Sequence, residues 1–144
     1  MATLTEPGIF YTVEFEPLAL LRLPLAAFKQ AGVLFERGQD DLDNYEFAVL
    51  LTENSVPFAL FHYDQQSDAT IDVFVPRGSI PPSMAAPFLM RLADEFGIDP
   101  RYFTIRGSLD EPSVARTRGL MYSTLPAVPI PIIQWDTHRR ERSY

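Results

Sequence analysis

The sequence contains no cysteine among its 144 residues. This absence excludes disulfides, thiolate zinc sites, iron–sulfur clusters and cysteine nucleophiles. It fits a reducing compartment, and because the N-terminus shows no secretory signal, we expect a cytoplasmic protein.

Long hydrophobic runs are also missing. The most apolar stretch, residues 18–28, contains an arginine and a proline and is far shorter than the ~20 residues that a membrane-spanning helix needs. We therefore expect a soluble protein that does not enter membranes.

The chain is equally poor in the residues of common catalytic and cofactor sites. Lys29 is the only lysine, so a phosphate-binding loop with its lysine is absent, and His62 and His138 are the only histidines, too few for a multi-histidine metal site. The sequence has no nucleophile elbow, no glycine-rich dinucleotide motif and no EF-hand loop. We therefore expect no cofactor and no metal, and an enzyme is the less favoured interpretation.

What the sequence does contain is enough apolar material for one folded domain. Hydrophobic residues make up 47% of the chain and aromatic residues 12%, well above the level of disordered proteins. The length is that of one domain. Proline becomes frequent only near the end of the chain. We therefore predict a single domain over residues 1–125 and a proline-rich tail over residues 126–144.

Periodicity predicts an α+β fold built on an antiparallel sheet. Apolar and polar residues alternate over 9–16, as in a half-buried strand, and the runs 45–52, 56–63 and 69–75 are separated by short turns. These three runs predict a three-stranded meander over about 45–75. Proline at the start and glycine after the end predict helices over about 24–31 and 83–96 that flank the sheet. A further strand is expected at 101–106, then a long loop over 107–119 and a strand at 120–125.

The proline-rich tail is too apolar to be a plain solvated linker. Its prolines forbid regular helix and leave an extended conformation, but it also carries four aliphatic residues and the only tryptophan, Trp135. We therefore expect the tail to dock on something, either its own domain or a second copy, in which case the protein would be a homodimer formed by exchange.

Acidic residues are concentrated in one part of the chain. Residues 36–72 carry nine acids against Arg37 alone, whereas residues 73–144 carry nine arginines against seven acids. Such a surface repels nucleic acid and attracts basic proteins. The predicted partner-binding residues are the acids of this region together with the tryptophan of the tail: Asp40, Asp41, Asp43, Glu46, Asp64, Asp68, Asp72 and Trp135.

These patterns favour a non-enzymatic module that binds another protein, such as an inhibitor, an immunity-type protein or a chaperone-like adaptor. The order of elements resembles small chaperone-like folds that cradle secretion effectors, a likeness of fold that assigns no residue a role. The alternatives are a small enzyme or a domain that binds a small molecule or peptide, using the aromatic-rich sheet and His62, with Asp64 and Asp72 near the imidazole. The plainer expectation is that His62 faces solvent at a strand end, and that Asp94 and Glu95 are simply solvated.

Overall fold

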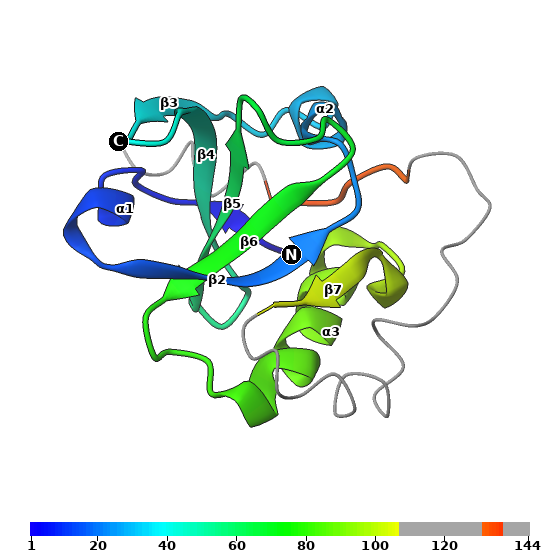
Figure 1. Ribbon diagram of the computed structural model, residues 1–144. Coiled ribbons are helices and arrows are strands. Elements are labelled where there is room, and N and C mark those ends of the chain that lie inside the picture. Colours follow the sequence, from blue (N-terminus) through cyan, green and yellow to red (C-terminus); the bar gives the residue numbers. More distant parts are fainter. Residues whose placement is uncertain (107–130, 137–144) are drawn as a thin grey trace.

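The computed structural model describes residues 1–106 and 131–136, and these form an α+β domain around one antiparallel sheet (Figure 1). Within these residues the sheet has seven strands in the order β1-β4-β5-β6-β2-β7, with β3 paired to β4. The strands are β1 Thr3–Leu4, β2 Phe15–Leu21, β3 Glu36–Gln39, β4 Asn44–Leu51, β5 Pro57–Tyr63, β6 Ile71–Pro76 and β7 Phe103–Ile105. The helices are α1 Ile9–Thr12, α2 Leu25–Gln30 and α3 Ala85–Phe96, with 3-10 turns at Pro82–Met84 and Pro100–Tyr102. The predicted fold class is confirmed, in a sheet larger than the meander alone.

The predicted meander is confirmed as β4, β5 and β6, which occupy the middle of the sheet. The register between β4 and β5 runs without a break from Tyr45 opposite Tyr63 to Leu51 opposite Pro57. Successive side chains of a strand point to opposite faces. Both faces of these strands are apolar, so the sheet must be covered on both sides.

The prediction of a strand over residues 9–16 is wrong. Residues Ile9–Thr12 form one helical turn, and the strand begins only at Phe15 and continues to Leu21. The apolar residues of this segment are explained by packing and not by a strand. Ile9 and Phe10 contact the aromatic residues on one face of the sheet. Proline has no backbone N–H to donate within a sheet, and two features of β2 accommodate Pro17. The pairing with β7 begins only at Ala19, and the pairing with β6 shifts its register between Pro17 and Ala19.

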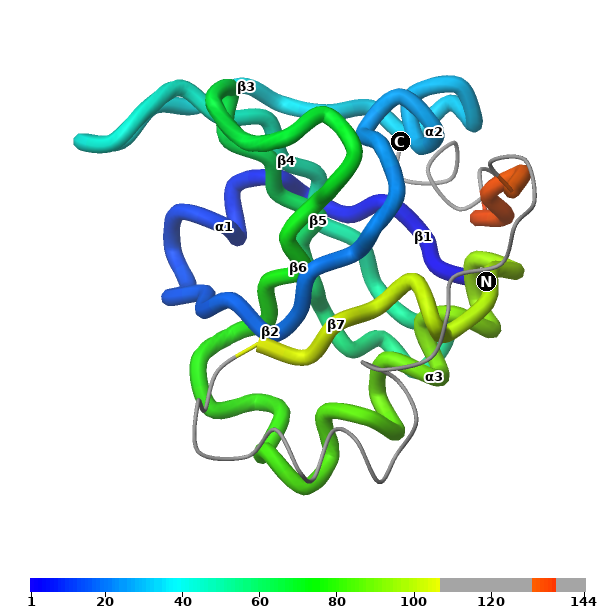
Figure 2. Tube along the Cα trace, turned by 45° about the vertical axis from the view of Figure 1, so that its right-hand side comes forward, coloured from blue at the N-terminus to red at the C-terminus, as the bar shows by residue number. Residues whose placement is uncertain are grey.

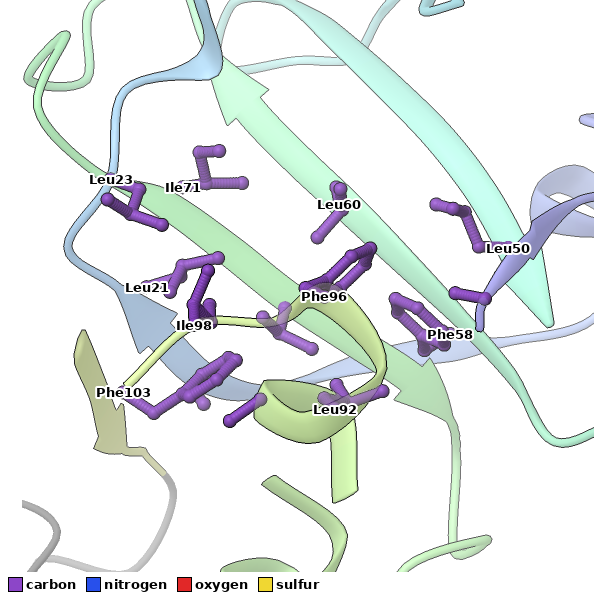
Figure 3. Packing of buried hydrophobic residues seen from close by; sticks show 14 of the residues in the cluster. Leu21, Leu23, Leu50, Phe58, Leu60, Ile71, Leu92, Phe96, Ile98 and Phe103 are labelled. Carbon is purple, nitrogen blue, oxygen red and sulfur yellow. The ribbon is translucent and has the colours of Figure 1, made fainter. Parts of the chain in front are cut away.

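Both predicted helices are confirmed, and they cover the same face of the sheet. Pro24 directly precedes α2, and Gly97 ends α3 with φ of 69°. Figure 3 shows the core beneath them, where Leu92 and Phe96 of α3 meet side chains from β2, β4, β5, β6 and β7. The labelled residues of this core are Leu21, Leu23, Leu50, Phe58, Leu60, Ile71, Leu92, Phe96, Ile98 and Phe103.

The described part of the tail packs on its own domain (Figure 2). Ile133 and Trp135 are buried, and the indole nitrogen of Trp135 donates a hydrogen bond of 2.8 Å to the carbonyl of Ala31, just after α2. The backbone of residues 134 and 136 donates to the carbonyls of Phe96 and Ala2, at 3.0 and 2.7 Å. Residues 131–136 thus contact their own domain, and the rest of the predicted tail lies outside the described residues. The predicted loop at 107–119 and strand at 120–125 lie outside the described residues.

Replacing Trp135 should therefore destabilise the domain although the residue lies far along the chain. We expect Trp135→Ala to lower the free energy of unfolding by about 3 kcal/mol, because it opens a cavity and leaves the carbonyl of Ala31 without its donor. Ile132→Ala is the matched control, since that side chain is 87% exposed and should change the stability by less than about 0.5 kcal/mol. Urea unfolding of both variants measures this. Equal stabilities would show that the tail contributes nothing to the core.

Candidate functional site

Five of the predicted partner-binding residues lie together at one end of the sheet. Asp40, Asp41 and Asp43 belong to the turn between β3 and β4, and Asp64 and Asp68 belong to the turn between β5 and β6. The two turns are joined by hydrogen bonds from the amide of residue 65 to Oδ2 of Asp43, at 2.8 Å, and from the amide of Asp64 to the carbonyl of residue 44, at 2.9 Å. We call this surface, residues 40–43 and 64–68, the acidic end.

Asp40 organises the first turn of the acidic end. Its Oδ1 accepts hydrogen bonds from the amides of Leu42 and Asp43, at 2.9 and 3.1 Å, and its Oδ2 accepts one from the hydroxyl of Tyr63, at 2.6 Å. The hydrogen bond from Tyr63 is the main reason that the pKa of Asp40 lies below its ordinary value. Burial, with help from Asp40, raises the pKa of Tyr63 to about 12. Asp40 therefore has a structural role whether or not it meets a partner.

Two basic residues lie beside the acidic end and partly neutralise it. The ammonium of Lys29 is 2.6 Å from Oε1 of Glu46, and the guanidinium of Arg37 is 2.9 Å from Oδ2 of Asp64 and 3.8 Å from Glu46. Asp41 and Asp68 are exposed and form no ion pair or side-chain hydrogen bond with the described residues. A partner could therefore bind these two carboxylates without breaking an ion pair or a side-chain hydrogen bond within the described residues.

Leu42 adds an apolar side chain to this charged surface. It is 77% exposed and sits at the tip of the turn between Asp41 and Asp43. A large aliphatic side chain held at a turn tip gains nothing from the fold of its own domain. It would gain from burial against another molecule.

Glu46, Asp72 and Trp135 are the remaining predicted binding residues. Glu46 lies on β4 beside the acidic end, whereas Asp72 and Trp135 lie elsewhere. Asp72 of β6 is buried on the same face of the sheet as the ring of its cross-strand partner Phe61. Its Oδ1 lies 2.9 Å from the guanidinium of Arg106, with no hydrogen bond to that oxygen in the described part of the chain. Burial raises the pKa of Asp72, and Arg106 counteracts part of this rise. Trp135 is part of the core beside α2. Neither side chain faces the acidic end.

The expectation that His62 faces solvent is wrong, because the side chain is buried. His62 follows Phe58 and Leu60 along one face of β5, and the chain after β5 folds back so that the carbonyl of Ser67 lies 3.0 Å from its Nε2. A carbonyl only accepts hydrogen bonds, so Nε2 carries the proton of this contact. Asp72 pairs with Phe61 and so lies on the opposite face of the sheet, although it is near enough for His62 to counteract electrostatically part of the rise that burial causes in the pKa of Asp72. The described residues therefore form no hydrogen-bonded pair of histidine and carboxylate.

The aromatic face of the meander is covered by another part of the chain. Phe10 of α1 lies over it, with its ring centroid 4.6 Å from that of Phe47 and 5.8 Å from that of Phe61, in stacked orientations. Tyr45 and Phe74 complete the cluster around Phe61, at 4.7 Å each. The protein covers this part of the face with its own ring.

A pocket that the sequence did not predict opens at the other end of the sheet. It has a volume of about 420 Å³ and lies between the turn after β4 and the outer side of α3. It is lined by Glu53, Pro87, Met90, Arg91, Asp94 and Glu95. The expectation that Glu95 is simply solvated is wrong, since its side chain is buried and its Oε1 accepts a hydrogen bond of 2.8 Å from the amide of Glu53.

The described residues offer no metal site and no membrane span. Nowhere in residues 1–106 and 131–136 do three histidine, cysteine or acidic side chains converge to hold a metal ion. Among the helices of these residues, none is long and apolar enough to cross a bilayer. Comparisons of the chain with protein-family models, with curated proteins and with solved structures found no match in any of the three.

Removing the hydroxyl of Tyr63 tests how the acidic end is organised. We expect Tyr63→Phe to raise the pKa of Asp40 towards 3.8, because the hydrogen bond from Tyr63 is the main cause of its lowering. A carboxyl whose pKa is lower in the folded than in the unfolded chain stabilises the fold above its unfolded-state pKa. That stabilisation is lost as the pH falls through the folded-state pKa. The variant should therefore be less stable at neutral pH and lose less stability on acidification.

Carbon-13 NMR titration of the side-chain carboxyls, together with unfolding at several pH values, measures both effects. Tyr11→Phe is the control, because Tyr11 is exposed and does not bond to Asp40. An Asp40 pKa that stays the same in Tyr63→Phe would mean that the turn holds its carboxylate without the tyrosine.

Proposed function

We propose that this protein is a non-enzymatic binding module that presents the acidic end to a partner protein with a basic surface. One observation carries the proposal: two separate turns are tied together so that five aspartates share one end of the sheet. Fixing these charges in place before binding removes part of the ordering cost of association. Like charges held close together destabilise the free protein, and a basic partner would relieve this repulsion.

The balance of charge at the acidic end supports a cationic partner. Seven carboxylates lie in this region of the fold against two cations, Lys29 and Arg37. The carboxylates are Glu36, Asp40, Asp41, Asp43, Glu46, Asp64 and Asp68. Such a surface speeds association with basic proteins and repels a phosphate backbone. This sign of charge supports a protein partner over a nucleic acid.

The exposed Leu42 gives the proposed contact an apolar centre. Interfaces commonly combine a buried apolar anchor with a polar rim, and here the rim would be the aspartates on either side. Inhibitors, immunity-type proteins and chaperone-like adaptors are the classes that use a small acidic domain in this way. A cytoplasmic location and a homodimer through the tail stay predictions that accompany the proposal.

The test uses charge reversal at Asp41 and Asp68, the two aspartates of the acidic end that form no ion pair or side-chain hydrogen bond with the described residues. The protein is captured with its partner from the cells that naturally produce it, the partner is identified by mass, and binding is remeasured with the purified pair. We expect Asp41→Lys with Asp68→Lys to weaken binding at least about tenfold, mainly through a slower association rate that depends on salt. Glu6→Lys, an exposed reversal outside the acidic end, should have little effect.

Two results would contradict the proposal. The first is a partner whose affinity is the same for the double reversal and for the wild type. The second is a protein that captures no stoichiometric partner, or only a nucleic acid. Leu42→Ser adds a check that is independent of charge, because it should weaken binding through a faster dissociation rate without changing the salt dependence.

A further inference from the structure

Glu95, one of the residues that line the pocket beside α3, has a buried carboxylate oxygen with no hydrogen-bond partner among the described residues. Glu95 is only 7% exposed, and its Oε2 accepts no hydrogen bond from the described residues. Its Oε1, by contrast, accepts the amide of Glu53 in the turn after β4. Leaving a buried charged oxygen unpaired costs more than leaving a neutral one unpaired. The side chain therefore lacks a donor, and it lines an open pocket where a ligand could supply one.

The charges around the pocket determine the sign of that donor. Glu53 and Asp94 line the pocket beside Glu95, against a single cation, Arg91. Arg91 is exposed and forms no ion pair with the acids of the pocket in the described part of the chain. Among the described residues, Glu53 forms one ion pair, with the α-amino group of Met1 at 3.9 Å from its Oε2, and both groups are exposed. An anion would be repelled, and a neutral ligand would leave the buried carboxylate without a countercharge.

The shape of the pocket distinguishes an organic cation from a metal ion. These carboxylates do not converge as metal ligands, in keeping with the lack of any such cluster among the described residues. Pro87 and Met90 provide an apolar wall about two turns and one turn before the acids on α3, and Met90 is half exposed. A ligand that fits has an aliphatic stem to lie along this wall and a cationic head that can donate to more than one carboxylate.

We propose that this pocket binds an arginine side chain of a peptide, with the guanidinium donating to Oε2 of Glu95 and to the carboxylate of Glu53 or Asp94. The guanidinium is a planar fork with five donors, so it can satisfy two carboxylates at once, whereas an ammonium acts as a compact point charge. Glu53 closes one side of the pocket, and its side chain is 74% exposed, so it can change rotamer to admit the head group.

This site is independent of the acidic end. The acidic end lies where β4 begins and the pocket lies after β4 ends, and eight residues of strand separate them by about 25 Å. The two sites can therefore be tested separately, and variants at one serve as controls for the other.

The experiment is an NMR titration of the full chain with N-acetyl-arginine amide. We expect saturable shifts at the amides of residue 53 and of residues 90–95. The matched ligand is N-acetyl-citrulline amide, which has nearly the same shape without the charge and should cause no saturable shift. N-acetyl-lysine amide should bind more weakly than the arginine compound. Because one side chain supplies little binding energy, the titration extends to tens of millimolar.

Glu95→Gln tests the carboxylate without removing the structural hydrogen bond, because the amide oxygen can still accept from residue 53. We expect it to weaken binding at least about tenfold, as the loss of a charge-assisted hydrogen bond implies. Should that variant unfold, Glu53→Gln tests the same site at an exposed side chain, with a smaller loss expected. Asp41→Asn, at the acidic end, should bind like the wild type. Arg91→Ala should bind at least as well, since it removes a competing cation.

Several outcomes would overturn the proposal. One is the absence of saturable shifts with the arginine compound, and another is equal binding of the citrulline compound. Shifts confined to residues 40–43 and 64–68 would assign the binding to the acidic end, and unchanged affinity in folded Glu95→Gln would show that the buried carboxylate has no role in binding.

Discussion

The register between β4 and β5 is the constraint on which the rest of the structure depends. From Tyr45 opposite Tyr63 to Leu51 opposite Pro57 it has no bulge, so every side chain of the meander has a fixed face. One face carries aromatic residues that meet Phe10, and the other carries the residues that α2, α3 and the tail cover. A slip by one residue would exchange these two faces. The same register sets the ends of β4, and with them the acidic end and the pocket.

The elements predictable from the sequence are those whose signals are local. The meander, α2 and α3 follow from alternation, turn residues, Pro24 and Gly97, and these were confirmed. The helical turn at Ile9–Thr12 was not predictable, because its apolar residues alternate like a strand and only the finished sheet shows what Phe10 covers. The short strands β1 and β3 carry too few residues for a pattern and exist because β4 offers them its edge.

The candidate sites show the same division between local and long-range information. Charge density along the chain was enough to predict an acidic surface, since Asp40, Asp41 and Asp43 are consecutive or nearly so. It could not separate the buried Asp72 from the exposed Asp68, because that difference depends on strand pairing. Glu95 carried one weak signal: it lies three residues after Leu92, at the edge of the apolar face of α3. Its contact with Glu53 joins residues 42 positions apart, beyond the reach of any pattern.

The central claim is that the acidic end is a contact surface for a basic protein. Hydrogen–deuterium exchange of the protein alone and in its complex tests this claim most directly, because it reports which backbone amides the partner protects. We expect slower exchange at residues 40–43 and 64–68 in the complex, with the amides of β5 unchanged. Protection that is confined to other surfaces, with these two turns exchanging as fast as in the free protein, would contradict it.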